Sequence, residues 1–186
     1  GSFNPVGGVQ ESSEINNATH SATPMLVQLP PPSDLQVTQV VSPPGGKVGD
    51  TLTFSWTVTN KGTSPAGGRW TDAVYLSTDA TWDYGDILVG TVNHPSGTLT
   101  ANQGYSAQLA ALLPPMLPGL YRAIVRTDVF DDLYEAQFKA NNATAASDTL
   151  VVTVNPLLIG TPAPGQIRKD GSLLYRVNVP AGQTSA

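Results

Sequence analysis

The stretch DTLTFSWTVTN at residues 50–60 is the clearest structural signal in the sequence. Apolar residues alternate there with threonine and serine, which is the period-two pattern of a strand buried on one face. Leu52, Phe54, Trp56 and Val58 fall on one face, and hydroxyl side chains fall on the other. We expect the apolar face to lie in a core and the hydroxyl face to meet solvent.

Six further segments have strand-like composition and are bounded by Gly, Pro, Asn or Asp, which favour turns. Asn60, Lys61 and Gly62 end the first strand, and we expect a tight turn there because Asn and Gly tolerate a positive φ. Together the seven segments predict an all-β fold, an antiparallel two-sheet sandwich of about seven strands. The six further segments are residues 34–41, 70–78, 86–93, 104–113, 119–128 and 147–154.

Three aromatic residues have structural roles in this prediction. Trp56 lies on the inward face of its strand and is assigned to the core. Trp70 opens the next strand and is expected to close one end of the sandwich. Tyr121 follows Pro118 and Gly119 and matches the corner tyrosine of immunoglobulin-like domains, which is a structural residue.

Composition excludes several classes of function. Only 12% of residues are charged, the net charge is −5, and no stretch is rich in Lys or Arg. Nucleic acid and anionic membranes are therefore not expected partners. The chain has no cysteine, which excludes disulfides, thiolate metal sites and a cysteine nucleophile. Residues 1–20 lack the features of a signal peptide. No phosphate-binding, dinucleotide-binding or serine-hydrolase motif occurs, so we predict no enzyme activity.

Two parts of the chain resemble each other. INNATHSATPMLVQLPP at residues 15–31 aligns with ANNATAASDTLVVTVNP at residues 140–156, although two Thr-rich strands can also match by chance. The repeat predicts that residues 1–30 are the C-terminal end of a preceding module, and that residues 31–155 form one complete module. The prolines at this junction predict a stiff linker. Residues 156–186 then begin a further β-domain.

Three stretches of the complete module carry a resemblance to a known family. They read DLQVTQVVSPPGGKVGDTLTFSWTVTNKGTSPA, WTDAVYLSTDATWDYGDILVG and LPGLYRAIVRTDVFDDLYEAQFKANN. The module resembles the CARDB domain, the cell-adhesion-related domain found in bacteria. The resemblance implies an immunoglobulin-like sandwich, repeated in tandem in large secreted or surface proteins. Residues 9–29 look like the end of a second copy.

The chain departs from the family pattern at its closing motif. The stretch EAQFKANN of the complete module has Lys139 near the place of the family's second acidic residue. A role that needs both carboxylates is therefore in doubt. The tail, residues 156–186, resembles the start of a bacterial pre-peptidase C-terminal domain.

The connection STDATWDYGD at residues 77–86 is the candidate site. Asp79, Asp83 and Asp86 can point oxygen atoms at one hard cation, and Ca²⁺ accepts such flexible oxygen cages. The spacing is not that of an EF-hand loop. In the structural alternative, the Asp side chains shape the turn by accepting hydrogen bonds from backbone N–H groups. The sequence leaves both interpretations open, and calcium is the one cofactor considered.

Trp82 lies in the same connection and is the candidate ligand-contact residue, because a loop-tip aromatic can stack on a glycan or protein. Its structural alternative is a lid folded over the base of the hairpin. A second acidic stretch, TDVFDDLYE, is expected to be a solvated loop. It contains Asp128, Asp131, Asp132 and Glu135.

These features predict a non-catalytic structural or adhesion repeat of a large secreted or cell-surface bacterial protein, which acts as a spacer and ligand-binding module. The expected partners are neighbouring domains of the same chain and a surface glycan or protein, without membrane insertion. One alternative is an accessory domain of a secreted peptidase or glycosidase whose catalytic domain lies elsewhere. Another is a carbohydrate- or protein-binding module with a calcium-stiffened loop.

Overall fold

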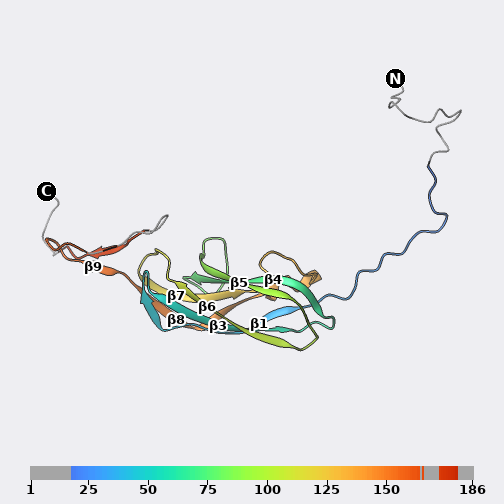
Figure 1. The fold of residues 1–186 in the computed structure, drawn as a ribbon, viewed down its shortest axis with the longest axis horizontal. Helices are drawn as coiled ribbons and strands as arrows, with labels where there is room; N and C mark the ends of the chain where they lie inside the picture. The colour runs from blue at the N-terminus through green and yellow to red at the C-terminus, as the bar shows by residue number, and fades with distance from the viewer. Residues whose placement is uncertain (1–17, 164, 166–171, 180–186) are drawn as a thin grey trace, which may run out of the picture. The chain divides into compact units, whose positions relative to one another are not determined.

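The computed structural model describes residues 18–163, 165 and 172–179. The chain divides into two units, residues 1–30 and residues 31–186. The second unit contains a two-layer sandwich of one three-stranded and one five-stranded sheet (Figure 1). The predicted all-β, immunoglobulin-like sandwich is therefore confirmed.

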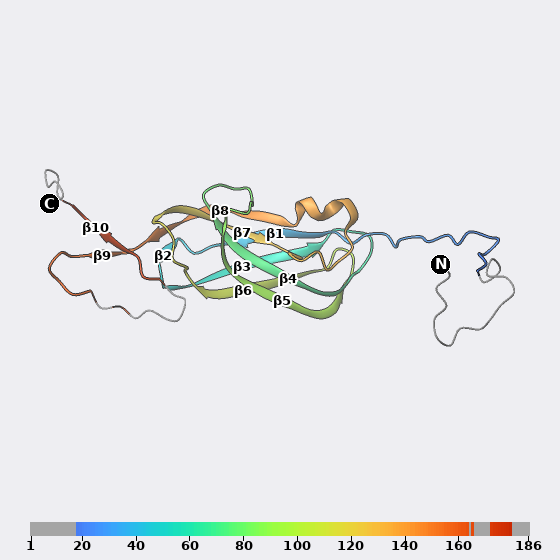
Figure 2. The same ribbon diagram turned by 90° about the horizontal axis from the view of Figure 1, so that it is seen from above.

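The two sheets draw their strands from distant parts of the sequence (Figure 2). The three-stranded sheet has the order β1-β3-β6, from β1 (Leu35–Val41), β3 (Thr51–Asn60) and β6 (Gly104–Leu112). The five-stranded sheet has the order β2-β8-β7-β4-β5, from β2 (Gly45–Lys47), β8 (Ala143–Thr153), β7 (Gly119–Arg126), β4 (Ala66–Ser77) and β5 (Ile87–Leu99). The remaining elements are the 3₁₀ helix η1 (Ala136–Asn141) and a separate pair, β9 (Asn155–Leu157) and β10 (Tyr175–Val177).

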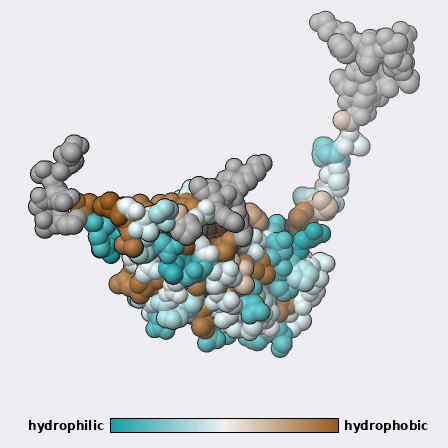
Figure 3. All heavy atoms as spheres, turned by 60° about the vertical axis from the view of Figure 1, so that its left-hand side comes forward, coloured by the Kyte–Doolittle hydropathy of each residue, from teal (hydrophilic) through white to brown (hydrophobic). Residues whose placement is uncertain are grey.

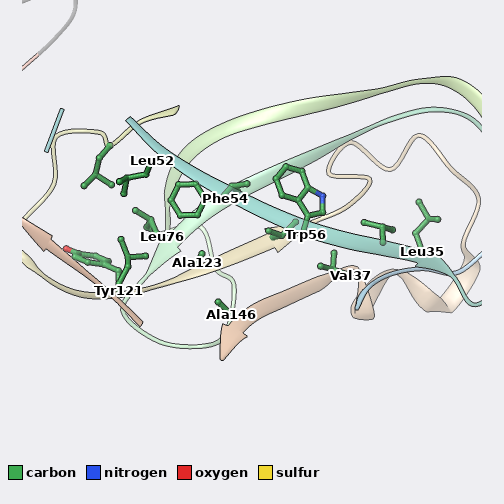
Figure 4. Close-up of a cluster of buried hydrophobic side chains, with 14 of the residues drawn as sticks. Leu35, Val37, Leu52, Phe54, Trp56, Leu76, Tyr121, Ala123 and Ala146 are labelled. Carbon is green, nitrogen blue, oxygen red and sulfur yellow. The ribbon is translucent and has the colours of Figure 1, made fainter. Parts of the chain in front are cut away.

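The core lies between the sheets and is built around β3. Phe54 and Trp56 are 0% and 2% exposed, and the threonines between the inward residues face outward. Leu76 of β4 and Ala123 of β7 belong to the same cluster (Figure 4). Burying one large apolar side chain contributes about 1.5–3 kcal/mol, so the rings of Phe54 and Trp56 together contribute about 3–6 kcal/mol to folding. The predicted inward face of residues 50–60 is thus confirmed.

Seven of the observed strands correspond to the seven predicted ones, with differences at their ends. The segment predicted as 86–93 extends to Leu99, past Pro95. Proline is tolerated there because β5 lies at the edge of its sheet. The short β2 was not predicted, and it pairs with β8 in parallel, so the sandwich is not purely antiparallel.

The turn after β3 holds the incoming chain in place. The backbone N–H of Lys61 donates to the carbonyl oxygen of Asp34 at 2.6 Å, and the N–H of Asp34 donates to Oδ1 of Asn60 at 3.1 Å. A Cβ at Gly62 would lie 2.8 Å from the nitrogen of Asp34 and 2.9 Å from Cα of Ser33. The expected positive φ in this turn is wrong, because none of Asn60, Lys61 and Gly62 has one. Glycine is needed instead for the close approach of the linker.

The segment that precedes this junction contains no strand between residues 18 and 30. Its apolar residues are largely exposed; they are Met25, Leu26, Val27 and Leu29. Asn16 and Asn17, on which the predicted repeat depends, lie outside the described residues. The assignments of residues 1–30, 31–155 and 156–186 to three modules stay predictions.

Candidate functional site: an aromatic groove on the five-stranded sheet

The connection between β4 and β5 folds back over the outer face of the five-stranded sheet. Trp82 is half-buried there, and its ring meets Tyr75 of β4 edge-on, with the centroids 5.8 Å apart. The guanidinium carbon of Arg126, on β7, lies 3.7 Å from the centroid of the Trp82 ring. Ala73 and Ile124 are buried although they lie outside the main core cluster. Trp82 therefore lies as a lid over the sheet, which agrees with its structural alternative, and its role as a ligand contact stays a prediction.

A groove lies beside this lid, with a volume of about 400 Å³. Its lining includes Tyr84 and Leu88 from one side of the hairpin and Phe130 from the connection after β7. Tyr84 is 96% exposed and Phe130 is 68% exposed. Exposed apolar side chains that gather around a hollow mark interaction surfaces more often than isolated ones do. Sequence analysis missed Tyr84 and Phe130, although both are aromatic residues placed between strands.

The three predicted calcium ligands act within the turn. Oδ1 of Asp79 accepts a hydrogen bond from the N–H of Thr81 at 2.7 Å, and Oδ1 of Asp83 accepts one from the N–H of Gly85 at 2.6 Å. Oδ2 of Asp86 accepts a hydrogen bond from the N–H of Asp83 at 2.9 Å. These contacts are those of the turn-shaping alternative. Among the described residues, no three acidic or histidine side chains cluster closely enough to hold a metal ion. Calcium binding stays a prediction.

The second acidic stretch is only partly the solvated loop that was expected. Glu135 is fully buried, and its carboxylate accepts hydrogen bonds from the N–H of Leu35 at 2.5 Å and from Nδ2 of Asn142 at 2.6 Å. Asp128 is also buried, and it accepts hydrogen bonds from the N–H groups of Asp132 and Leu133. The expectation is therefore wrong for Glu135 and Asp128, because they satisfy backbone donors where loops close over the sandwich.

Burial sets the electrostatics of these carboxyl groups. Desolvation raises the pKa of Glu135 above its ordinary value, and the hydrogen bonds from Asn142 and Leu35 lower it by less. Desolvation likewise raises the pKa of Asp128, against the opposing effect of its two backbone donors. The glutamate of the family's closing motif thus holds the first strand against η1. This clasp, defined as Glu135 with Leu35 and Asn142, is a structural feature.

A third buried carboxylate lies inside the sandwich. Oδ2 of Asp72 accepts hydrogen bonds from Nε1 of Trp56 and from the hydroxyl of Tyr105, each at 2.7 Å. Nε1 of Trp70 donates to the same hydroxyl at 2.9 Å. Desolvation raises the pKa of Asp72 above its ordinary value. The network joins both sheets, and Trp70 is fully buried, as expected for a residue that closes the sandwich. The ring of His94 stacks on Trp70 with centroids 3.9 Å apart.

The match to known families decides the classification. The model of the CARDB family matches residues 32–146, which is more than half of the chain. The chain belongs to the CARDB family. Comparison with curated proteins found no match. The CARDB domain is a non-catalytic immunoglobulin-like module, and such domains usually occur in extracellular or surface proteins.

Solved structures similar to this CARDB domain come from several organisms. The CARDB domain of a Pyrococcus furiosus protein, crystallised in complex with di-metal ions, is 17% identical with a TM-score of 0.46, covering 67% of this chain and 97% of that one. A solution structure of the same P. furiosus domain is 18% identical with a TM-score of 0.45, covering 64% and 94%. A mutant β-glucosidase from Listeria innocua in complex with laminaribiose is 16% identical with a TM-score of 0.41, covering 65% of this chain and only 16% of that one.

Proposed function

We propose that this CARDB domain is an in-line spacer and adhesion module of a large secreted or cell-surface bacterial protein. The observation that supports this most is where the chain enters and leaves the sandwich. The hydroxyl of Thr144, near the start of β8, donates to the carbonyl oxygen of Val37 at 2.6 Å, so the incoming β1 lies beside the start of β8. β8 ends nine residues later at Thr153, which is roughly 30 Å away at about 3.3 Å per residue.

This geometry suits a string of domains, because each module of this kind adds its length to the reach of the chain. The incoming linker is fixed to the body: the N–H of Ser33 donates to the carbonyl oxygen of Tyr134 at 3.2 Å. Prolines before Ser33 keep the linker extended. Apolar and polar residues are interspersed over the surface in view in Figure 3. Within the described residues, no helix has the length and apolar character needed to span a membrane.

A replacement experiment in the cells that make the full-length protein tests the spacer role. Residues 31–155 are deleted, or replaced by an unrelated sandwich with the same end-to-end length, and an epitope is placed beyond the domain. We expect deletion to reduce binding of an external antibody to the epitope and the replacement to restore it. Equal antibody binding in all three strains contradicts the spacer role, and absence of the epitope from the surface contradicts the location.

A second candidate function is an accessory role in a secreted peptidase or glycosidase. The resemblance of residues 156–186 to a pre-peptidase C-terminal domain favours it; in this tail the structure describes the parallel pair β9 and β10. The test compares the full-length protein with its 31–155 deletion on casein and on chromogenic glycosides. Hydrolysis that weakens on deletion supports this role, and no hydrolysis by the full-length protein contradicts it.

A further inference from the structure

The rings available to a partner in the groove are those of Tyr84 and Phe130. The face of Trp82 is in contact with Arg126, and its ring also meets Tyr75 and Tyr84 edge-on at 5.8 and 5.1 Å. A ligand therefore cannot stack freely on Trp82. Tyr84 and Phe130 line the same groove. Nearly all of the Tyr84 side chain is exposed, and so is about two thirds of Phe130. The predicted ligand contact thus shifts from Trp82 to these two neighbours.

The polar residues around these rings are mainly acidic. Asp83, Asp86 and Asp131 line the groove, together with one basic residue, Arg126. Asp83 and Asp86 each use one carboxylate oxygen for a backbone N–H of the turn, so the second oxygen of each can accept a hydrogen bond from a ligand. Arg126 is held against the Trp82 ring. Asp131 is paired with Lys139, and Arg126 offsets one further carboxylate, so the groove keeps a surplus of one negative charge beside Asp83 and Asp86, which attracts cations.

The protein's own side chains show that cations fit this surface. The guanidinium of Arg126 lies over an aromatic ring at 3.7 Å, within the range of a cation–π contact. Nζ of Lys139 lies 2.8 Å from Oδ1 of Asp131. Both kinds of contact, a cation on a ring and a cation on a carboxylate, are available again at the exposed Tyr84 and Phe130 rings and at Asp83 and Asp86.

We propose that the groove lined by Tyr84, Phe130 and Leu88 binds a basic segment of a protein partner. An arginine or lysine of that segment lies over the exposed rings with its charge toward Asp83 and Asp86. A neighbouring apolar residue of the partner packs on Leu88, which is half exposed. This inference deepens the proposed adhesion role by naming the chemistry of the partner, and it rests on that role only for its biological setting.

The charge balance favours this occupant over two others. A second copy of this chain is a poor match, because the sequence has 9 basic and 14 acidic residues and a net charge of −5. A neutral saccharide can stack on the rings and donate hydroxyl hydrogen bonds to the carboxylates, but it carries no positive charge to balance the negative surplus. A basic peptide uses both the rings and the carboxylates, and like-charge repulsion disfavours acidic partners.

The test uses NMR of the ¹⁵N-labelled chain with small probes. Nα-acetyl-argininamide is titrated against Nα-acetyl-citrullinamide, which has the same shape but replaces the charged guanidinium with a neutral urea group. Methyl β-glucoside serves as the saccharide probe. The variants are Tyr84→Ala, Phe130→Ala and the double variant Asp83→Asn with Asp86→Asn, whose side-chain oxygens can still accept the turn hydrogen bonds. Tyr134→Ala is the matched control, since Tyr134 is exposed but does not line the groove.

We expect saturable shifts of Tyr84, Leu88 and Phe130 with argininamide, and binding weaker by at least about fivefold with citrullinamide. Tyr84→Ala, Phe130→Ala and the double Asp→Asn variant should each weaken argininamide binding by a similar factor, and Tyr134→Ala should not. Stronger response to the glucoside, equal binding of both amides, or shifts spread over all acidic residues overturns the inference. None of these outcomes bears on the epitope experiment, so failure here is distinct from failure of the spacer role.

Discussion

Replacing Glu135 separates the contribution of its shape from that of its charge. In Glu135→Ala, the N–H of Leu35 and the side-chain amide of Asn142 both lose their acceptor in a buried position. Each unsatisfied buried donor costs about 1–3 kcal/mol. The expected loss is therefore about 2–6 kcal/mol, or a fall in melting temperature of roughly 8–24 °C at about 4 °C per kcal/mol for a domain of this size.

Glu135→Gln should have a much smaller effect. The Gln carbonyl oxygen can still accept from Leu35, while its amide nitrogen would face Asn142. Oδ1 of Asn142 is buried and has no partner among the described residues, so a flip of the Asn142 amide lets it accept from the new donor. The buried charge is also removed. We expect Glu135→Gln to stay within about 1 kcal/mol of the wild type at pH 7.

Urea unfolding of the wild type and both variants at several pH values measures these differences in the free energy of unfolding. The pKa of Glu135 is raised in the folded chain, so the folded chain binds this proton more tightly than the unfolded chain. Its contribution to stability therefore falls as pH rises through the folded pKa. Glu135→Gln should show a weaker pH dependence than the wild type. The reasoning is refuted if Glu135→Gln is as damaging as Glu135→Ala, or if Glu135→Ala costs less than about 1 kcal/mol.

Three other predictions concern the linker, pH and calcium. Gly62→Ala should cost about 1–3 kcal/mol of stability by overpacking against Ser33 and Asp34. Gly67→Ala is the control and should be nearly neutral, because a Cβ there has no atom within 4 Å. Equal effects of the two substitutions in thermal unfolding contradict this prediction. Burial raises the pKa of Asp72, Asp128 and Glu135, so the wild type should gain stability as the pH falls through their folded pKa values toward their ordinary values; a loss of stability in urea unfolding over that step contradicts this. A calcium site of extracellular affinity should add about 0.4–1.4 kcal/mol at about 1 mM Ca²⁺; a melting temperature that chelation leaves unchanged removes that site.

The strands could be predicted because their signal is local. Alternation around Phe54 and Trp56 identifies the inward face of β3 without knowledge of any partner. No such alternation marks Asp72 of β4, because residues 70–74 are all buried. The acceptor role of Asp72 is not local, because Tyr105 belongs to a strand of the other sheet. The unpredicted β2 has three residues, two of them glycine, too few for a periodic signal.

The candidate site was harder to predict because it depends on contacts between distant segments. Trp82 and Arg126 are 44 positions apart, and their contact holds the Trp82 ring over the sheet, while Tyr84 stays exposed. The burial of Glu135 likewise depends on Leu35, 100 positions away. An acidic loop and a buried clasp have the same local composition, so only the closed sandwich distinguishes them.

Exchange of the Trp56 indole proton tests most directly whether two sheets close around β3. In the folded chain this N–H donates to Asp72 at 2.7 Å inside the core, beside the fully buried Phe54. NMR in D₂O should show the Trp56 proton exchanging only through unfolding, which slows exchange by a factor of at least about 10³. Exchange of the Trp56 proton at the rate of a free indole would mean that water reaches the centre of the proposed core, and it would contradict the sandwich.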